Sequence, residues 1–322
     1  MILTRHAESM LWVGRHLERA EMTSRWLNVA SASAMHLTPE DAEVEWSQIV
    51  RALGLEDRFG KSHDCYEQRA TCEFLLSDDE NPGSVTWAIT ALRDNLRIAR
   101  DRVPVELWEE VNRLHLRLAG VDVEHLLDSE PHEVYAMVRE GCQAISGVVA
   151  ESMMRDEGHA FIVVGRMLER SMLTVGLLRA GHARPGGEFD GDRLLRMTSA
   201  LQAFRRLHGH DADPIDTSRF LLEADDIPRT VLSCLKRVES RLALLSADTD
   251  TLALPQRLVG RLRSRLEFGD IGDELRKSPL PALDELAIDL VALSDAISSQ
   301  VFRPEAEPVM HAQFVRPGSA PT

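Results

Sequence analysis

The chain has 322 residues, of which 52 are acidic and 37 are lysine or arginine, so its formal net charge is −15. This balance excludes broad nucleic-acid binding, which needs basic side chains to replace the counterions of phosphates, and it disfavours docking on anionic membranes. Hydrophobic residues make up 44% of the chain and aromatic residues only 5%, which predicts a folded core and disfavours a β-sandwich or barrel.

Several signals of location are missing from the sequence. No uncharged apolar stretch approaches the length of about 18 residues that a membrane-spanning helix needs. Glu8 interrupts the N-terminal segment before a secretory signal can form. The cysteines make no CxxC pair and no zinc-binding spacing with histidine; they are Cys65, Cys72, Cys142 and Cys234. These features predict a cytoplasmic protein with reduced thiols.

Apolar residues recur with helical spacing along most of the chain, and no segment shows the sustained alternation of a strand. Thr38-Pro39-Glu40-Asp41 is a typical helix start, with a capping hydroxyl, a proline and two acids. In chain order, we expect helices over residues 6–34, 39–53, 82–101, 104–118, 131–153, 157–181, 191–208, 227–246, 255–267 and 282–302. Residues 54–70 and 182–192 are predicted to be irregular, and residues 303–322 a disordered tail.

The strongest organisational signal is an internal repeat. The segment 13–23 recurs as 164–174, and the segment 74–85 recurs in part as 220–231. Two motifs in the same order and at nearly the same separation indicate a duplication. The sequence therefore predicts an all-α fold of two repeated helical bundles, over about 1–150 and 151–302, packed in pseudo-twofold relation into one body.

The first helix of each repeat has an unusual surface. In the helix over 6–34, both faces carry large apolar side chains, with arginines set between them, which predicts a central helix whose arginines have partners. Arg15 is spaced to pair with Glu18 within the helix, and Glu21 is spaced to pair with Arg25. In the second copy, Arg166 is spaced to pair with Glu169.

A glycine recurs in the middle of each of these helices, as Gly14 and Gly165. Glycine at such a position costs about 1 kcal/mol relative to alanine. Its recurrence predicts either a close contact between helices or the close approach of a ligand.

Two interpretations of these charges remain open. One is a buried network that joins the two motif helices, because the planar fork of arginine suits such pairing. The other is a polar site for a carboxylate or phosphate. Its binding residues would be Arg15, Arg19, Arg166 and Arg170, and the orienting or catalytic residues would be Glu18, Glu21 and Glu169. A cavity beside these side chains would favour the site.

A second arginine group lies at residues 93–101. Arg93, Arg97 and Arg100 follow one stripe of the predicted helix, beside its apolar face. The stripe is a candidate surface for an anionic ligand or partner, with Arg93 and Arg97 as binding residues, or it is a solvated face with salt bridges. The second repeat has no such stripe.

Motifs for familiar chemistry are absent. The sequence contains no phosphate loop, no GxGxxG and no GxSxG. It contains no Glu-x-x-His pair of the kind that holds di-iron centres in helical bundles. The sequence therefore predicts no metal and no cofactor.

The motifs together resemble the bacterial alpha-E domain family over residues 1–302. The resemblance rests on Arg5-His6-Ala7-Glu8, on the run from Trp12 to Glu21, and on further matching segments. These segments are Asn81-Pro82, 93–100, Leu107-Trp108 with Asn112, 155–174 and Asp226-Ile227-Pro228-Arg229. Two positions depart from the family pattern, since Met172 stands where the first copy has Glu21, and Gly83 replaces a small hydroxyl residue.

The resemblance implies an all-helical protein associated with ATP-grasp amide ligases of a circularly permuted type and with transglutaminase-like or proteasome-like peptidases. It implies a system that makes or modifies peptide-like bonds, in which this chain acts as a separate accessory partner. An alternative is an enzyme of acyl or aminoacyl transfer, with a glutamate as general base and arginines as oxyanion stabilisers. No nucleic acid or membrane is expected among its partners.

Overall fold

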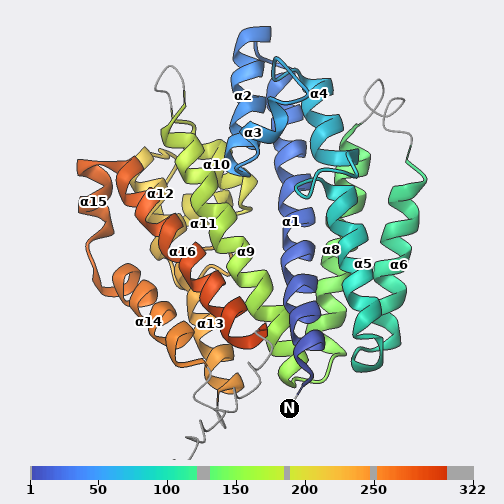
Figure 1. Ribbon diagram of the computed structural model, residues 1–322. Helices are drawn as coiled ribbons and strands as arrows, with labels where there is room; N and C mark the ends of the chain where they lie inside the picture. Colours follow the sequence, from blue (N-terminus) through green and yellow to red (C-terminus); the bar gives the residue numbers. More distant parts are fainter. Residues whose placement is uncertain (1, 122–130, 185–188, 247–251, 303–322) are drawn as a thin grey trace, which may run out of the picture.

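A computed structural model describes residues 2–121, 131–184, 189–246 and 252–302. Within these ranges the chain forms helices and no strand, which confirms the all-α prediction (Figure 1). The tail predicted over 303–322 lies outside the described residues. Among the described helices, none combines the length and the apolar character needed to cross a bilayer.

The helices of the first half are α1 (Thr4–Ala34), α2 (Pro39–Ala52), α3 (Glu56–Phe59), α4 (Gln68–Cys72), α5 (Val85–Ile98), α6 (Val105–Ala119) and α8 (Pro131–Glu151). Those of the second half are α9 (Glu157–His182), α10 (Gly191–Met197), α11 (Leu201–His208), α12 (Pro214–Glu223), α13 (Val231–Leu245), α14 (Ala253–Phe268), α15 (Ile271–Lys277) and α16 (Pro279–Phe302). A π-helical turn (Glu73–Ser77) follows α4, and a 3₁₀ turn (Arg100–Arg102) follows α5.

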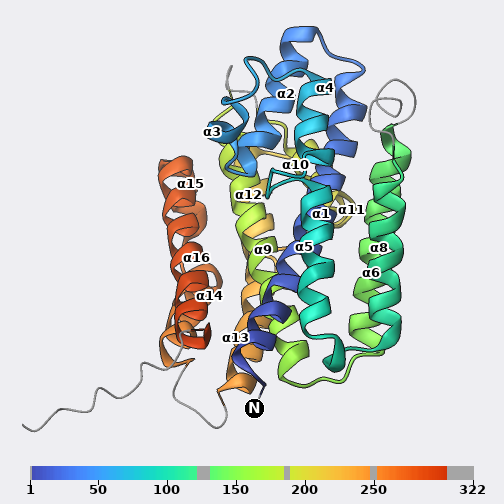
Figure 2. The same cartoon turned by 45° about the vertical axis from the view of Figure 1, so that its right-hand side comes forward.

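The helices α1 and α9 pack against each other at the centre of the molecule (Figure 1). On one side of this pair, α5 and α8 pack on α1, and α6 packs against both α5 and α8. On the other side, α13 and α16 pack on α9. Figure 2 shows α14, α15 and α16 as an outer layer beside this centre. Apolar residues on both faces of α1, such as Leu17 and Trp26, are fully buried. The prediction of a central motif helix is therefore confirmed.

Each central helix places a glycine against the backbone of the other. A Cβ atom on Gly14 would lie 2.1 Å from the carbonyl oxygen of Ile162, and a Cβ on Gly165 would lie 2.0 Å from that of Leu11. No other residue has room there, since real Cβ atoms essentially never come within 3.0 Å of another heavy atom. The two glycines thus allow a close helix–helix contact, as one of the two predictions for them states.

Several predicted boundaries are wrong. The helix expected over 191–208 is two helices, broken where Ser199 adopts a left-handed conformation with φ 57°. The helix expected from residue 82 begins at Val85, where Ser84 accepts a hydrogen bond from the backbone N–H of Trp87. The irregular segment 54–70 contains α3 and the start of α4, and the helices α12 and α15 were not predicted.

Candidate functional site

Two arginines of α1 hold the carboxylate of Glu169 on α9; we call Arg15, Arg19 and Glu169 the Glu169 cluster. Arg15 donates from Nε to Oε2 of Glu169 over 2.8 Å, and Arg19 donates from Nε to Oε1 over 2.7 Å. Arg15 also donates to Oγ of Ser294 on α16 (3.0 Å), and Arg19 donates to the carbonyl oxygen of Pro82 (3.1 Å). Each guanidinium group is therefore fixed at more than one point.

A larger network surrounds Glu18 on α1. Glu18 accepts from Nε of Arg170 over 2.6 Å and from Nε of Arg166 over 2.8 Å. Glu21 accepts from Arg166 (3.0 Å) and pairs with Arg229, and Arg25 donates to it over 3.0 Å. Neither glutamate has any exposed surface. We call this group the Glu18 cluster; it consists of Glu18, Glu21, Arg25, Arg166, Arg170 and Arg229.

The expected pairing within each motif helix is wrong in both copies. Arg15 pairs with Glu169 rather than with Glu18, and Arg166 pairs with Glu18 rather than with Glu169. The physical reason is the glycine contact between α1 and α9, which brings the backbones close enough for the side chains to reach across. The one pair predicted within a helix that does form is Glu21 with Arg25.

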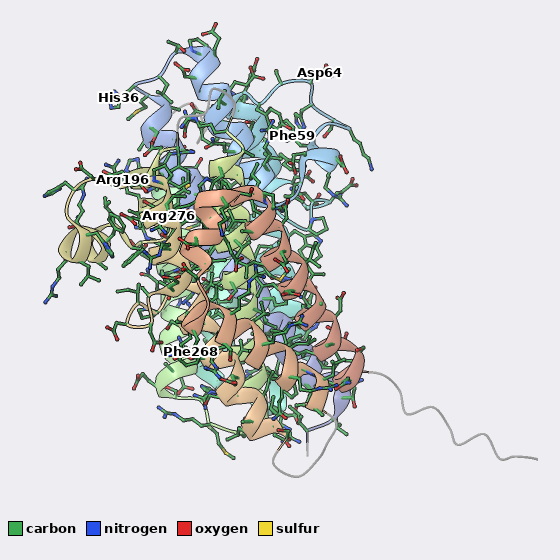
Figure 3. The ribbon with its side chains drawn as sticks, turned by 90° about the vertical axis from the view of Figure 1, so that its left-hand side faces the viewer. His36, Phe59, Asp64, Arg196, Phe268 and Arg276 are labelled. Carbon is green, nitrogen blue, oxygen red and sulfur yellow. The ribbon has the colours of Figure 1, made fainter. Side chains whose placement is uncertain are left out.

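The arginines labelled in Figure 3 provide a contrast. Arg196 on α10 and Arg276 on α15 are more than half exposed, and each lies near an aspartate of its own helix. Such surface pairs contribute little to stability. Four arginines of the two clusters instead link α1 to α9 through buried carboxylates; they are Arg15, Arg19, Arg166 and Arg170. Removing one partner of such a buried pair is strongly destabilising.

The carboxylates of Glu18 and Glu169 are both held in the ionised form. Burial alone would raise the pKa of Glu18, but the charges of Arg170 and Arg166 outweigh it and hold that pKa well below its usual range. Burial is likewise outweighed at Glu169 by Arg19 and Arg15, so its pKa is also lowered. A general base works best with a pKa near the operating pH, so these carboxylates are better suited to holding arginines than to accepting protons.

A cavity of about 450 Å³ opens beside the Glu169 cluster, between α1, α2, α9 and α16; we call it the Glu169 cavity. The charged residues that line it are Arg15, Arg19, Arg51, Glu169 and Arg179. Arg15 and Arg19 share one carboxylate, and Arg179 pairs with Asp284. Arg51 has no ion pair among the residues that the structure describes. Positive charge is therefore in excess in this cavity.

Two small differences between the repeats leave this cavity open. Met172 occupies the position that matches Glu21, and Gly83 occupies the position that matches Arg229. Both residues line the Glu169 cavity. The ion pair that closes the surroundings of Glu18 thus has no counterpart beside Glu169.

The structure brings together seven of the nine predicted site residues. Arg93 and Arg97 lie elsewhere, on α5. Arg93 donates to Oδ1 of Asn112 (2.8 Å) and stacks over the ring of Trp108, and Arg97 pairs with Asp94 over 3.4 Å. Their contacts are thus with α5 and α6, not with the two clusters.

Sequence reasoning missed two arginines, Arg229 and Arg51. Arg229 belongs to the segment Asp226-Ile227-Pro228-Arg229, which supported the family resemblance but was given no role. Arg51 carries no signal in the sequence, because only the packing of α2 against α9 turns it toward the cavity. In the described part of the chain, no group of three or more metal-ligating side chains is found.

Comparison with known proteins assigns the family. Residues 2–302 match Alpha-E, described as a predicted alpha-helical domain with a conserved ER motif. The chain belongs to the Alpha-E family.

Relatives of this Alpha-E chain include much longer proteins. An uncharacterised protein of Mycobacterium bovis is 26% identical over 310 residues, covering 87% of this chain and 33% of that protein. An uncharacterised protein of Mycobacterium tuberculosis is 25% identical with the same coverage. The chain therefore spans about a third of the length of the curated relatives it matches. No solved structure matches it.

The structure gives the ER motif of the family a physical meaning. The sequence contains two Glu-Arg dipeptides, Glu18-Arg19 and Glu169-Arg170. Arg19 binds Glu169, and Arg170 binds Glu18. Each dipeptide thus supplies the partner of the other, and the two together join α1 to α9.

Proposed function

We propose that this Alpha-E domain is a binding module that holds a carboxylate or phosphate group in the Glu169 cavity and serves as an accessory partner of an ATP-grasp amide ligase. The single observation that carries the binding part is the excess of arginine in that cavity. Among the described residues Arg51 forms no ion pair, and Arg15 and Arg19 share one carboxylate. Planar guanidinium groups match the geometry of carboxylates and phosphates.

The remaining lining of the cavity supports a ligand with an apolar body. Leu53, Leu55, Leu173 and Val291 all face the cavity. Its volume lies within the range of roughly 300–1,000 Å³ typical of small-molecule sites. An acylated amino acid or the end of a peptide combines an anionic group with such a body, which is consistent with a system that makes or modifies peptide-like bonds.

We also propose that the two halves arose by duplication and are related by a pseudo-twofold axis through the α1–α9 contact. Matching ring contacts support this proposal. Phe59 stacks on His63 with centroids 4.6 Å apart, and Phe204 stacks on His208 with centroids 4.8 Å apart. Each phenylalanine also meets a second one edge-on, Phe74 at 5.1 Å and Phe220 at 5.3 Å.

The partner part of the proposal rests on the family resemblance. The length of the mycobacterial relatives supports a modular arrangement, because the matched region is about a third of each of them. A transglutaminase-like or proteasome-like peptidase is a further partner of the same system. We propose a cytoplasmic setting, which is consistent with the four free cysteines.

Calorimetric titration with N-acetyl-leucine, which has a carboxylate and an apolar body, tests the binding part. Arg51→Gln is expected to weaken binding about tenfold, equivalent to about 1.4 kcal/mol. Arg206→Gln removes the same charge from an exposed position on α11 and should leave the affinity unchanged. Equal affinities for both variants, or no binding by the unaltered protein at millimolar concentration, would contradict the proposal.

The partner part has its own test. The purified chain is mixed with a circularly permuted ATP-grasp amide ligase from the same organism, and complex formation is measured at micromolar concentration. The ATP-dependent activity of the ligase toward candidate amino acids is then measured with and without this protein. We expect a complex and a change in activity; the absence of both would overturn the partnership and leave the binding part standing.

A further inference from the structure

A second cavity, of about 200 Å³, lies between α8, α9 and α13; we call it the Arg237 cavity. Its polar lining consists of Ser146, Arg155, His159, Arg166, Arg237 and Arg241. No carboxylate is among the described residues that line it. It shares no residue with the Glu169 cavity.

Three of these four arginines have no acidic partner. Arg155, Arg237 and Arg241 form no ion pair within the part of the chain that the structure describes. Only Arg166 is paired, with Glu18 and Glu21 behind it. In a chain with a net charge of −15, acidic residues are plentiful, so this lack of carboxylates sets the cavity apart from the rest of the molecule.

The charges around this cavity repel one another. Arg237 and Arg241 lie four residues apart on α13, a spacing at which like charges destabilise a helix. Burial, together with the charges of Arg170 and Arg166, lowers the pKa of Arg237. Burial also lowers the pKa of His159, and Arg241 and Arg155 lower it further, against the opposing charge of Asp156. A multiply charged anion would relieve this repulsion.

We propose that the Arg237 cavity is a binding site for a dianionic phosphoryl group. Guanidinium groups bind phosphate oxygens through paired N–H donors, and the cavity presents four of them. Its volume is below the range typical of whole drug-sized ligands, so it accommodates a phosphoryl group and leaves the rest of a larger molecule outside. Arg155 and the partly buried Arg237 both keep surface exposed to solvent, and they mark the side on which that remainder would lie.

Calorimetric titrations with inorganic phosphate, pyrophosphate and ADP at low ionic strength test the proposal. The three probes distinguish a free phosphate ion, a diphosphate and the end of a nucleotide. Whichever binds most tightly, the double variant Arg237→Gln/Arg241→Gln is expected to weaken its binding at least tenfold. Citrate, a multiply charged carboxylate, is expected to bind at least tenfold more weakly than that probe.

Matched variants separate this site from a general effect of charge. Arg117→Gln/Arg206→Gln removes two exposed arginines from α6 and α11 and should change the affinity less than twofold. Arg51→Gln, which tests the Glu169 cavity, should also leave it unchanged. If the phosphoryl site in the Arg237 cavity is disproved, the proposed function of the Glu169 cavity is therefore unaffected. Likewise, failure of the proposed function leaves the phosphoryl site standing.

Thermal unfolding without ligand supplies a second measurement. Because the unliganded arginines repel one another, the double variant is expected to melt at the same temperature as the unaltered protein or higher, and to lose the rise caused by the phosphoryl probe. A lower melting temperature without ligand would assign these arginines a structural role. That result, no binding of any probe at millimolar concentration, or undiminished binding by the double variant would overturn the proposal.

Discussion

The Glu18 and Glu169 clusters share one arrangement of ion pairs, in which two arginines of one central helix bind a glutamate of the other. They differ in the next layer of side chains. Beside Glu18, Glu21 and Arg229 add an ion pair, and the carboxylates are fully buried. Beside Glu169, Met172 and Gly83 leave a cavity lined by arginines. The same arrangement of charges therefore joins the two helices in both clusters, but only beside Glu169 does it border a cavity with excess positive charge.

The largest expected effect is the loss of the Glu18 carboxylate. Glu18→Gln keeps the shape of the side chain and leaves Arg170, which is only 5% exposed, without its counter-charge. We expect the free energy of unfolding in urea to fall by about 3–5 kcal/mol.

The matched variant on the other side is Glu169→Gln. The side chains of Arg15 and Arg19 are 10% and 20% exposed and keep other hydrogen-bond acceptors. The expected loss is therefore smaller, about 1–3 kcal/mol. Equal losses for the two variants would show that the surroundings of the clusters make no energetic difference.

We expect a substitution at either glycine of the α1–α9 contact to destabilise the protein by a similar amount. Gly14→Ala and Gly165→Ala each place a methyl group against a carbonyl oxygen of the facing helix, so each should lower the free energy of unfolding by about 1–3 kcal/mol. Gly147→Ala on α8 is the control, because its Cβ would meet nothing within 4 Å. That change should raise stability by up to about 1 kcal/mol.

A pH dependence is expected from His16, which lies on the Glu169 side and has no titratable counterpart at the matching position of the second copy. His16 packs between the rings of Trp12 and Trp87, whereas Met167 occupies the matching position in the second copy. Burial, followed by the charge of Arg19, lowers the pKa of His16 to about 3. Below its ordinary pKa of 6.5, the unfolded chain therefore takes up a proton that the folded chain does not, and stability falls as the pH falls.

The measurement is urea unfolding at pH 7 and pH 5. His16 should account for a loss of about 2 kcal/mol at pH 5, and His16→Phe should remove that part of the dependence. Below about pH 4.5, Glu18 and Glu169 add a further loss, because their lowered pKa values keep them ionised in the folded chain while the unfolded chain protonates. An unchanged slope for His16→Phe would contradict the assignment.

The smallest expected effect on stability comes from a substitution that makes the surroundings of Glu169 resemble those of Glu18. Met172→Glu places a carboxylate where Arg15 now lies 3.7 Å from the methionine sulfur. We expect the free energy of unfolding to change by less than about 1 kcal/mol, while the affinity for N-acetyl-leucine falls about tenfold. Met172→Leu adds no charge to the cavity and should retain the affinity. Undiminished binding by Met172→Glu would place the ligand elsewhere.

Much of the fold could be predicted from local sequence. Helical spacing found most helices, and the buried position of α1 followed from apolar side chains on both of its faces. The break at Ser199 could not be predicted, because the segment Thr198-Ser199-Ala200 contains no glycine or proline to signal a left-handed residue. The helix α12 was missed even though Pro214 marks its first residue.

The composition of the candidate site could be predicted, but its pairing could not. Recurring arginines and glutamates identified most residues of both clusters, and helical spacing paired Arg25 with Glu21, but Arg229 was given no role. Spacing along one helix suggested partners within that helix, whereas the observed partners depend on how closely α1 and α9 approach. That distance is set by Gly14 and Gly165 acting together, a property of two segments about 150 residues apart rather than of either one.

The reciprocal glycine contact also fixes the register of α1 and α9. A slide by one helical turn would shift each glycine by about 5.4 Å along its axis and bring a bulkier residue against the facing carbonyl. The central pair can therefore neither slip nor rotate without separating. We therefore expect any movement that accompanies ligand or partner binding to occur in the outer helices, while α1 and α9 keep their positions relative to each other.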